Sequence, residues 1–389
     1  MRTERLVAFC VFAVAVAGVS ANPVVWLHGW NSNGSSWRQF QEQMVSNGVA
    51  SADDFLTADY YAKEMGFSPD TPIEEIAEAV ACDIQDFYDA RKDGAPLDVV
   101  CHSMGGLVFR SMIANECLVD NSILRRYVTL GTPHYGQNLG ITYQARQMVY
   151  GSGFLWRLGE AWHFQGKCWP ATNALCIAGM TDAKSALLFS SSLNAPGGSY
   201  WDGLVHAWSA SLGKDVPVRY VYRSHSSSLA QVKAPPLCAL VDGEKDVVYR
   251  LVEDFLVRGT VPESRTPTYG GVHDGKIGKW VEAEQGVGAV FLQVCSAADG
   301  KPLAYGNPIG VSCRAVVTQK KFSPLKGMGL ESEYSKGLAQ LQGNFSANDR
   351  LTLTIKRPDG EPFKVKGDVS PSPASCRFLK VRDDGSAPQ

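Results

Sequence analysis

The segment over residues 97–113 constrains the fold of this chain more than any other. It begins with the mostly apolar run Leu97-Asp98-Val99-Val100-Cys101, which is expected to form a buried strand. A helix is expected over Gly105–Ile113, so that Ser103 lies on a sharp turn between the two elements. Such a turn holds a serine hydroxyl clear of a sheet and places the next backbone N–H at a helix N-terminus. The pattern therefore predicts that Ser103 is a nucleophile.

Short strands and helices alternate around this turn. A helix is expected over Pro72–Arg91, where apolar side chains recur at spacings of three and four, with a capping box formed by Thr71 and Glu74. The remaining expected elements are the strands Val24–Leu27, Tyr127–Leu130, Asn173–Met180 and Val216–Tyr222 and the helix Asp246–Val257. Strands separated by helices predict a mostly parallel sheet flanked by helices, which is an α/β fold.

The composition changes along the chain and suggests several parts. Its 389 residues exceed the usual size of one domain, about 100 to 200 residues. We expect a catalytic domain at 22–259, a linker at 260–275 that is rich in Thr, Pro, Ser and Gly, and a C-terminal domain at 276–389. This last part has strand-like runs between turns such as Asp299-Gly300 and no comparable helix, which predicts a β-sandwich-like accessory domain.

Residues 1–21 have the features of a secretory signal peptide. Arg2 and Arg5 give a positive start, Leu6–Val19 is uncharged and mostly apolar, and Val19-Ser20-Ala21 offers small residues for cleavage. A membrane anchor is the alternative, although the apolar stretch is shorter than the roughly 20 residues that a span needs. The ten cysteines suit an oxidising compartment. We therefore expect a secreted protein, periplasmic or extracellular.

Residues 137–172 interrupt the alternation with an insertion that is rich in aromatic side chains. Two interpretations are open. The rings form a lid that presents apolar surface to acyl chains or to a lipid interface, or they pack on the body as core. Cys168 and Cys176 are candidates for a disulfide that staples this region.

A serine nucleophile needs a histidine as base and a carboxylate that orients the histidine. His225 follows the strand expected at Val216–Tyr222, in a loop from which an imidazole can reach over the sheet edge, and it is favoured over His206. Asp202 is the favoured acid, and Asp182 is its rival.

Two backbone N–H groups are expected to form an oxyanion hole. The first belongs to Met104, which follows the serine at the start of the helix. The second is expected in the loop after an early strand, where Gly29 allows the backbone to bend toward the serine and Trp30 supplies the N–H. The alternative is that His28-Gly29 forms an ordinary turn.

Together these segments resemble secreted α/β-hydrolase lipases and esterases of bacterial type. The matching segments span about residues 23–230 and are Val25–Trp30, Val99–Gly106, Leu130–Gly136 and Asp202–Val205, the last followed by Ser209 and Leu212-Gly213. The resemblance implies an α/β-hydrolase fold and the hydrolysis of carboxylic esters, lipid esters among them. It assigns the triad to Ser103, His225 and Asp202, and it implies no organic cofactor.

The sequence departs from that family at two positions. Cys101 replaces the glycine that usually stands two residues before the serine, and we expect only a slightly altered turn because cysteine is small. Ser227 stands where many such lipases carry a calcium-binding aspartate, so no metal site of that kind is expected. The C-terminal part carries no such resemblance, and its partner stays open.

Other functions share some of these features. An acyltransferase or an amidase would use the same triad with a different acceptor. A surface or carbohydrate-binding protein would act through the C-terminal β-domain, although aromatic residues are sparse there for an extended sugar platform. The formal net charge of −2 argues against a nucleic acid partner, because no strong basic field is present.

Overall fold

The computed structural model describes residues 21–137, 139–181, 201–213, 216–227, 234–260, 285–300, 310–315, 323–324, 338–346, 351–356, 361–367, 369 and 376–386. The expected signal peptide, apart from Ala21, lies outside these residues. So do Asp182 and the expected linker, apart from its first residue.

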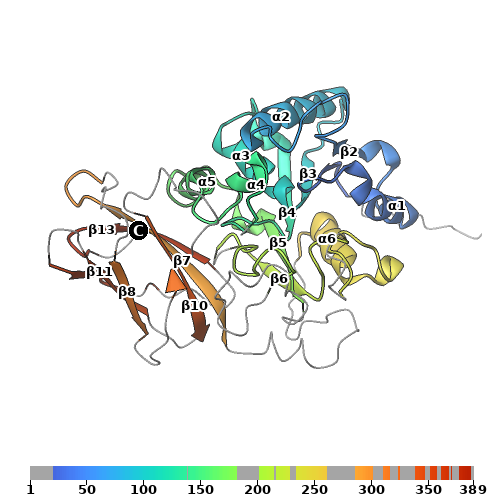
Figure 1. Cartoon of the computed structure of the whole chain (residues 1–389). Helices are drawn as coiled ribbons and strands as arrows, with labels where there is room; N and C mark the ends of the chain where they lie inside the picture. The colour runs from blue at the N-terminus through green and yellow to red at the C-terminus, as the bar shows by residue number, and fades with distance from the viewer. Residues whose placement is uncertain are drawn as a thin grey trace, which may run out of the picture.

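A six-stranded sheet forms the centre of the N-terminal part, with the order β2-β1-β3-β4-β5-β6 (Figure 1). Every neighbouring pair in this sheet is parallel. The strands are β1 (Val24–Leu27), β2 (Phe55–Ala58), β3 (Leu97–His102), β4 (Leu124–Leu130), β5 (Ala174–Gly179) and β6 (Val218–Val221). The predicted α/β fold is confirmed, and β2 is a strand that the sequence did not reveal.

Helices cover both faces of the sheet because its strands are apolar on both sides. In β1, Val25 and Leu27 pack in the cluster that contains residues of α2 (Ile73–Ala90), α3 (Met104–Ala114) and α5 (Gly153–Phe164). The alternate residues Val24 and Trp26 pack with α1 (Arg38–Ser46) and α6 (Val247–Arg258). The period of two along a strand thus divides the core into two layers of side chains.

The start of α2 differs from the expected capping box. Pro72 is the residue before the helix, and it makes no side-chain cap. The Ile73 N–H instead donates to the side chain of Gln147, 2.9 Å away, and the Gln147 amide donates to Glu74. Gln147 ends the short helix α4 (Tyr143–Gln147), so the insertion supplies the cap that the local sequence was expected to provide.

The C-terminal part contains two small sheets, in agreement with the β-rich expectation. One has the order β13-β7-β10-β9 and the other β12-β11-β8. The strands are β7 (Gln285–Cys295), β8 (Gly310–Ala315), β9 (Ser323–Pro324), β10 (Leu338–Ser346), β11 (Leu351–Lys356), β12 (Phe363–Lys364) and β13 (Cys376–Arg382). β7 pairs with β13 in parallel and with β10 in antiparallel register.

The aromatic insertion packs between the main sheet's helices and the C-terminal sheet. Trp162 and Trp169 are buried in the core around α3. Trp156 lies on the other side, with its ring 4.7 Å from that of Phe378 in β13. In the conformation seen here these rings face the protein interior, whereas Tyr143 is exposed.

The expected disulfide between Cys168 and Cys176 is wrong. Cys168 is an exposed free thiol, and Cys176 is a free thiol buried in β5. The reason is the strand itself, because the Cys176 side chain points into the core shared with α3. None of the helices in the described ranges has both the length and the apolar character needed to cross a membrane.

Candidate functional site

Ser103 lies on the turn between β3 and α3, in a backbone conformation that few non-glycine residues adopt. Its φ is 53° and its ψ is −123°. Such a conformation costs about 1–3 kcal/mol and persists only where the surroundings enforce it. The turn is enforced in part by close packing, because a methyl group on Gly105 would come within 2.5 Å of the Leu27 carbonyl oxygen. A methyl group on Gly106 would collide with Thr132.

The departure at Cys101 leaves this turn intact. The Cys101 side chain is fully buried in the core between β1 and α3. Burial raises the pKa of its thiol well above the usual range, so the group remains a neutral, small core residue.

The structure brings together the three side chains that the sequence singled out. His225 Nε2 lies 2.8 Å from Ser103 Oγ, and His225 Nδ1 lies 2.7 Å from Asp202 Oδ2. All three side chains are buried. In this chain of contacts the Ser103 hydroxyl donates to Nε2, while the protonated Nδ1 donates to the carboxylate. A hydroxyl, a base and an orienting carboxylate are thus within hydrogen-bond reach of one another.

The Asp202 carboxylate is held on its other side by backbone groups. Its Oδ1 accepts hydrogen bonds from the N–H groups of Leu204 and Val205, at 2.9 and 2.7 Å. The backbone N–H of His225 donates to the Asp202 carbonyl oxygen at 2.8 Å. These bonds tie the loop that carries the acid to the loop that carries the histidine.

Two glycines at the ends of neighbouring strands make room for the acid and the histidine. A methyl group on Gly131 would lie 2.9 Å from Asp202 Oδ2 and 3.3 Å from His225 Nδ1. A methyl group on Gly179 would lie 2.8 Å from Asp202 Cβ. Gly131 belongs to the segment that carried part of the family resemblance, but its contact with the acid and the histidine was not predicted from that segment.

His102 is a residue of the site that sequence reasoning missed. Its Nε2 lies 2.9 Å from the backbone carbonyl oxygen of His225, and the two rings are 4.9 Å apart. Burial lowers the pKa of His102 to about 3, so the ring is neutral and Nε2 carries the proton that is donated to this carbonyl. The residue before the serine therefore anchors the backbone of the histidine loop.

The two expected oxyanion donors lie beside the serine turn. Met104 is the first residue of α3, where backbone N–H groups have no acceptor within the helix. Trp30 follows Gly29, whose Cα faces the serine so closely that a methyl group there would lie 2.9 Å from Ser103 Cβ. The assignment of Trp30 and Met104 as donors stays a prediction.

The other candidate histidine, His206, lies in the interior. Its ring stacks between those of Trp201 and Trp208, each 5.7 Å away. Neither ring nitrogen has a hydrogen-bond partner among the residues that the structure describes, and burial lowers the pKa of His206 to about 4. His206 is therefore a packed, neutral side chain beside the acid rather than a partner of Ser103.

In the part of the chain that the structure describes, no group of three or more His, Cys, Asp or Glu side chains gathers in a way that would hold a metal ion.

Comparisons with known proteins find two kinds of similarity, one to a sequence family and one to solved structures. Residues 21–190 match the family described as "Putative serine esterase (DUF676)". The phospholipase PlaB from Legionella pneumophila, solved in complex with thio-NAD, is similar over 92% of this chain and 93% of its own, with a TM-score of 0.60 and 12% identity. The chain therefore has the α/β-hydrolase fold.

A second structure of PlaB matches this chain with the same coverage and TM-score and with 11% identity. The product of the gene lin2722 from Listeria innocua matches over 53% of this chain and 84% of its own, with a TM-score of 0.34 and 15% identity. No curated protein matches the sequence.

Proposed function

We propose that this protein is a secreted serine esterase that cleaves carboxylic esters of lipids through Ser103, His225 and Asp202 and an acyl-enzyme intermediate. One observation carries the proposal. The hydroxyl of Ser103, the imidazole of His225 and the carboxylate of Asp202 form an unbroken chain of two hydrogen bonds, 2.8 and 2.7 Å long.

The reaction follows from this arrangement. His225 Nε2 takes the proton of the Ser103 hydroxyl while Oγ attacks the ester carbonyl carbon. The N–H groups of Trp30 and Met104 stabilise the oxyanion of the tetrahedral intermediate. The protonated imidazole, held by Asp202, then gives its proton to the departing alcohol oxygen. A water molecule enters, loses a proton to His225 and releases the acid from Ser103 by the reverse sequence.

Lipid esters are the substrate class that we favour. The similar structure PlaB is titled a phospholipase, so phospholipid esters belong in the first substrate set beside simple acyl esters.

The decisive experiment compares Ser103→Ala with Ser111→Ala, a change at another buried serine of α3. Both proteins, and the wild type, are treated with a fluorophosphonate probe and with p-nitrophenyl esters of graded chain length. We expect Ser103→Ala to lose labelling and at least about 10³-fold in turnover while keeping its thermal transition, and Ser111→Ala to keep both activities. Ester turnover by Ser103→Ala at the wild-type rate would disprove the proposal.

Export of the mature protein is part of the proposal and has its own test. The sequence pattern of residues 1–21 supports it. Mass spectrometry of the protein recovered outside the cytoplasm should find an N-terminus at Asn22. An intact Met1 on the exported protein would contradict cleavage at this site.

A further inference from the structure

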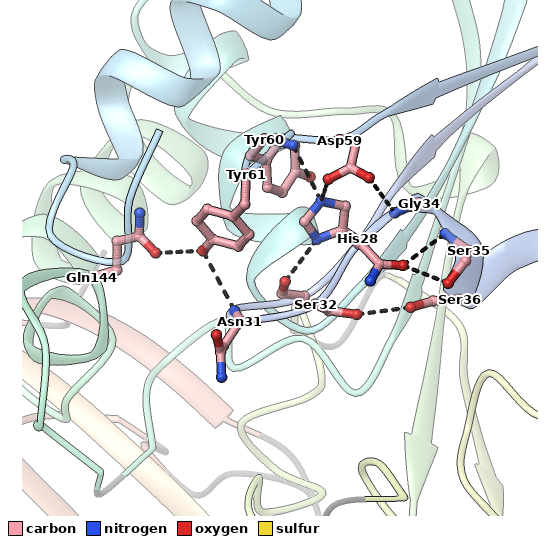
Figure 2. A network of polar contacts seen from close by, with 12 residues as sticks. His28, Asn31, Ser32, Gly34, Ser35, Ser36, Asp59, Tyr60, Tyr61 and Gln144 are labelled. Carbon is pink, nitrogen blue, oxygen red and sulfur yellow. Dashed lines mark hydrogen bonds and ion pairs between the residues drawn. The ribbon is translucent and has the colours of Figure 1, made fainter. Parts of the chain in front are cut away.

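The His28 imidazole is a fully buried polar group that the proposed reaction does not use. It follows directly after β1 and precedes the loop that carries Trp30. Its Nδ1 lies 2.8 Å from the carbonyl oxygen of Gly29, and its Nε2 lies 3.2 Å from the backbone N of Tyr60 (Figure 2). Both nitrogens therefore have backbone partners, and these partners fix the tautomer.

The tautomer follows from the chemistry of the two partners. The Tyr60 N–H can only donate, so Nε2 must accept and carries no proton. The Gly29 carbonyl can only accept, so Nδ1 carries the proton and donates. Asp59 Oδ1 also lies 3.5 Å from Nε2, a distance that would favour a charged ring. Burial is the larger influence and lowers the pKa of His28, so the ring is neutral with one proton, on Nδ1.

A hydrogen bond to the Gly29 carbonyl also determines where the next N–H points. The carbonyl of Gly29 and the N–H of Trp30 belong to one planar, trans peptide unit, in which the two groups point in opposite directions. Because the His28 ring holds the carbonyl, the Trp30 N–H must face the side away from the ring. The close approach of Gly29 to Ser103 Cβ puts this peptide unit next to the serine.

We propose that His28 is a positioning residue of the oxyanion hole: its Nδ1–H holds the Gly29–Trp30 peptide so that the Trp30 N–H faces the developing oxyanion on the substrate. The proposal rests on the function proposed above, because it assigns a role within that reaction. His28 acts through the peptide and does not touch the substrate.

The ring is itself held from several directions, which makes it a firm support. It lies 4.1 Å from the Tyr60 ring and 5.6 Å from the Tyr61 ring. Asp59, beside its Nε2, accepts a hydrogen bond from the Gly34 N–H at 3.1 Å and so ties the far end of the same loop to the segment after β2. Figure 2 shows His28 at the centre of these contacts.

Two amide substitutions separate the roles of the two ring nitrogens. The side-chain amide of His28→Asn can occupy the Nδ1 position and donate to the Gly29 carbonyl, whereas that of His28→Gln reaches the Nε2 position and leaves the carbonyl without its donor. His163→Gln serves as a control for the loss of a histidine in α5, away from Gly29.

The kinetic constants of the three variants with a soluble p-nitrophenyl ester test the proposal. We expect His28→Gln to lose about 10- to 100-fold in kcat with little change in KM, because an oxyanion donor acts on the transition state. His28→Asn should recover most of this loss, and His163→Gln should keep the wild-type kcat. The proposal is overturned if His28→Gln keeps the wild-type kcat, or if His28→Asn loses as much as His28→Gln.

A measurement on the wild-type protein covers the case in which the variants do not fold. NMR spectra of ¹⁵N-labelled protein should show the Nδ1–H tautomer for His28. They should also show a downfield shift of the Trp30 amide proton after Ser103 is phosphonylated, because the N–H then meets a charged oxygen. If the fluorophosphonate does not react with Ser103, both this proposal and the proposed function are refuted. A phosphonylated Ser103 with an unmoved Trp30 amide proton, or an Nε2–H tautomer, removes this proposal alone.

Discussion

Replacing His206 by phenylalanine should make the protein more resistant to acid. His206 is 1% exposed and lies between two indole rings, and neither of its nitrogens has a hydrogen-bond partner within the described part of the chain. Burial lowers its pKa to about 4, against an ordinary value of 6.5, although the nearby Asp202 carboxylate acts in the opposite direction. The unfolded chain therefore binds a proton at this residue at pH values where the folded protein does not.

The sign and size of the effect follow from this difference in proton binding. Above pH 6.5 both states are neutral at His206 and the residue has no effect on the pH dependence. As the pH falls from 6.5 toward 4, protonation favours the unfolded state, by about 1.4 kcal/mol for each pH unit. Between pH 7 and pH 5 the wild type should thus lose about 2 kcal/mol more than His206→Phe.

Urea unfolding at both pH values measures this quantity. Any constant cost of packing the larger ring cancels, because only the change between the two pH values is compared. Between pH 7 and pH 5, the unfolding free energy of the wild type should fall by about 2 kcal/mol more than that of His206→Phe. Equal losses in the two proteins would refute the reasoning and show that the His206 ring is protonated or solvated in the folded state.

Two further substitutions test the packing around the site. Gly131→Ala should lower kcat by at least about 10-fold, because Gly131 has a φ of 58° and the new methyl group would press on Asp202 and His225; an unchanged kcat would contradict the close approach. Phe378→Ala should destabilise the chain by about 3–5 kcal/mol, since the ring packs against Trp156; a loss below about 1 kcal/mol in urea unfolding would mean that β13 does not support the insertion.

Much of the site could be predicted because it depends on local sequence. The run Leu97–Cys101 is mostly apolar, with Asp98 as its one charged residue, and has the length of a buried strand, while the glycines after Ser103 allow the helix to begin at once. The loop after β6 brings His225 to the same edge of the sheet, because the carboxyl ends of parallel strands lie together. The order of elements along the chain therefore indicated which residues would meet.

The contacts that hold these residues in place could not be predicted in this way. Nothing in the local sequence indicates that His102 Nε2 would reach the carbonyl of His225, since 123 residues separate them. The cap of α2 by Gln147 could not be predicted for the same reason. The expected capping box uses neighbours along the chain, whereas the observed donor and acceptor lie 74 residues apart. Likewise, a pair of cysteines near in sequence was expected to bond, but β5 turns one of them into the core.

The amino-acid sequence by itself determined the parallel sheet, the serine turn and the identity of the side chains that meet there, because hydrophobic periodicity and turn residues act over short distances. Only the tertiary structure decided how the histidine and the acid are oriented, how His28 and His102 hold the backbone around them, and that the aromatic insertion packs against the C-terminal sheet. These features depend on distances and burial between segments far apart in the chain, and such distances exist only once the core has formed.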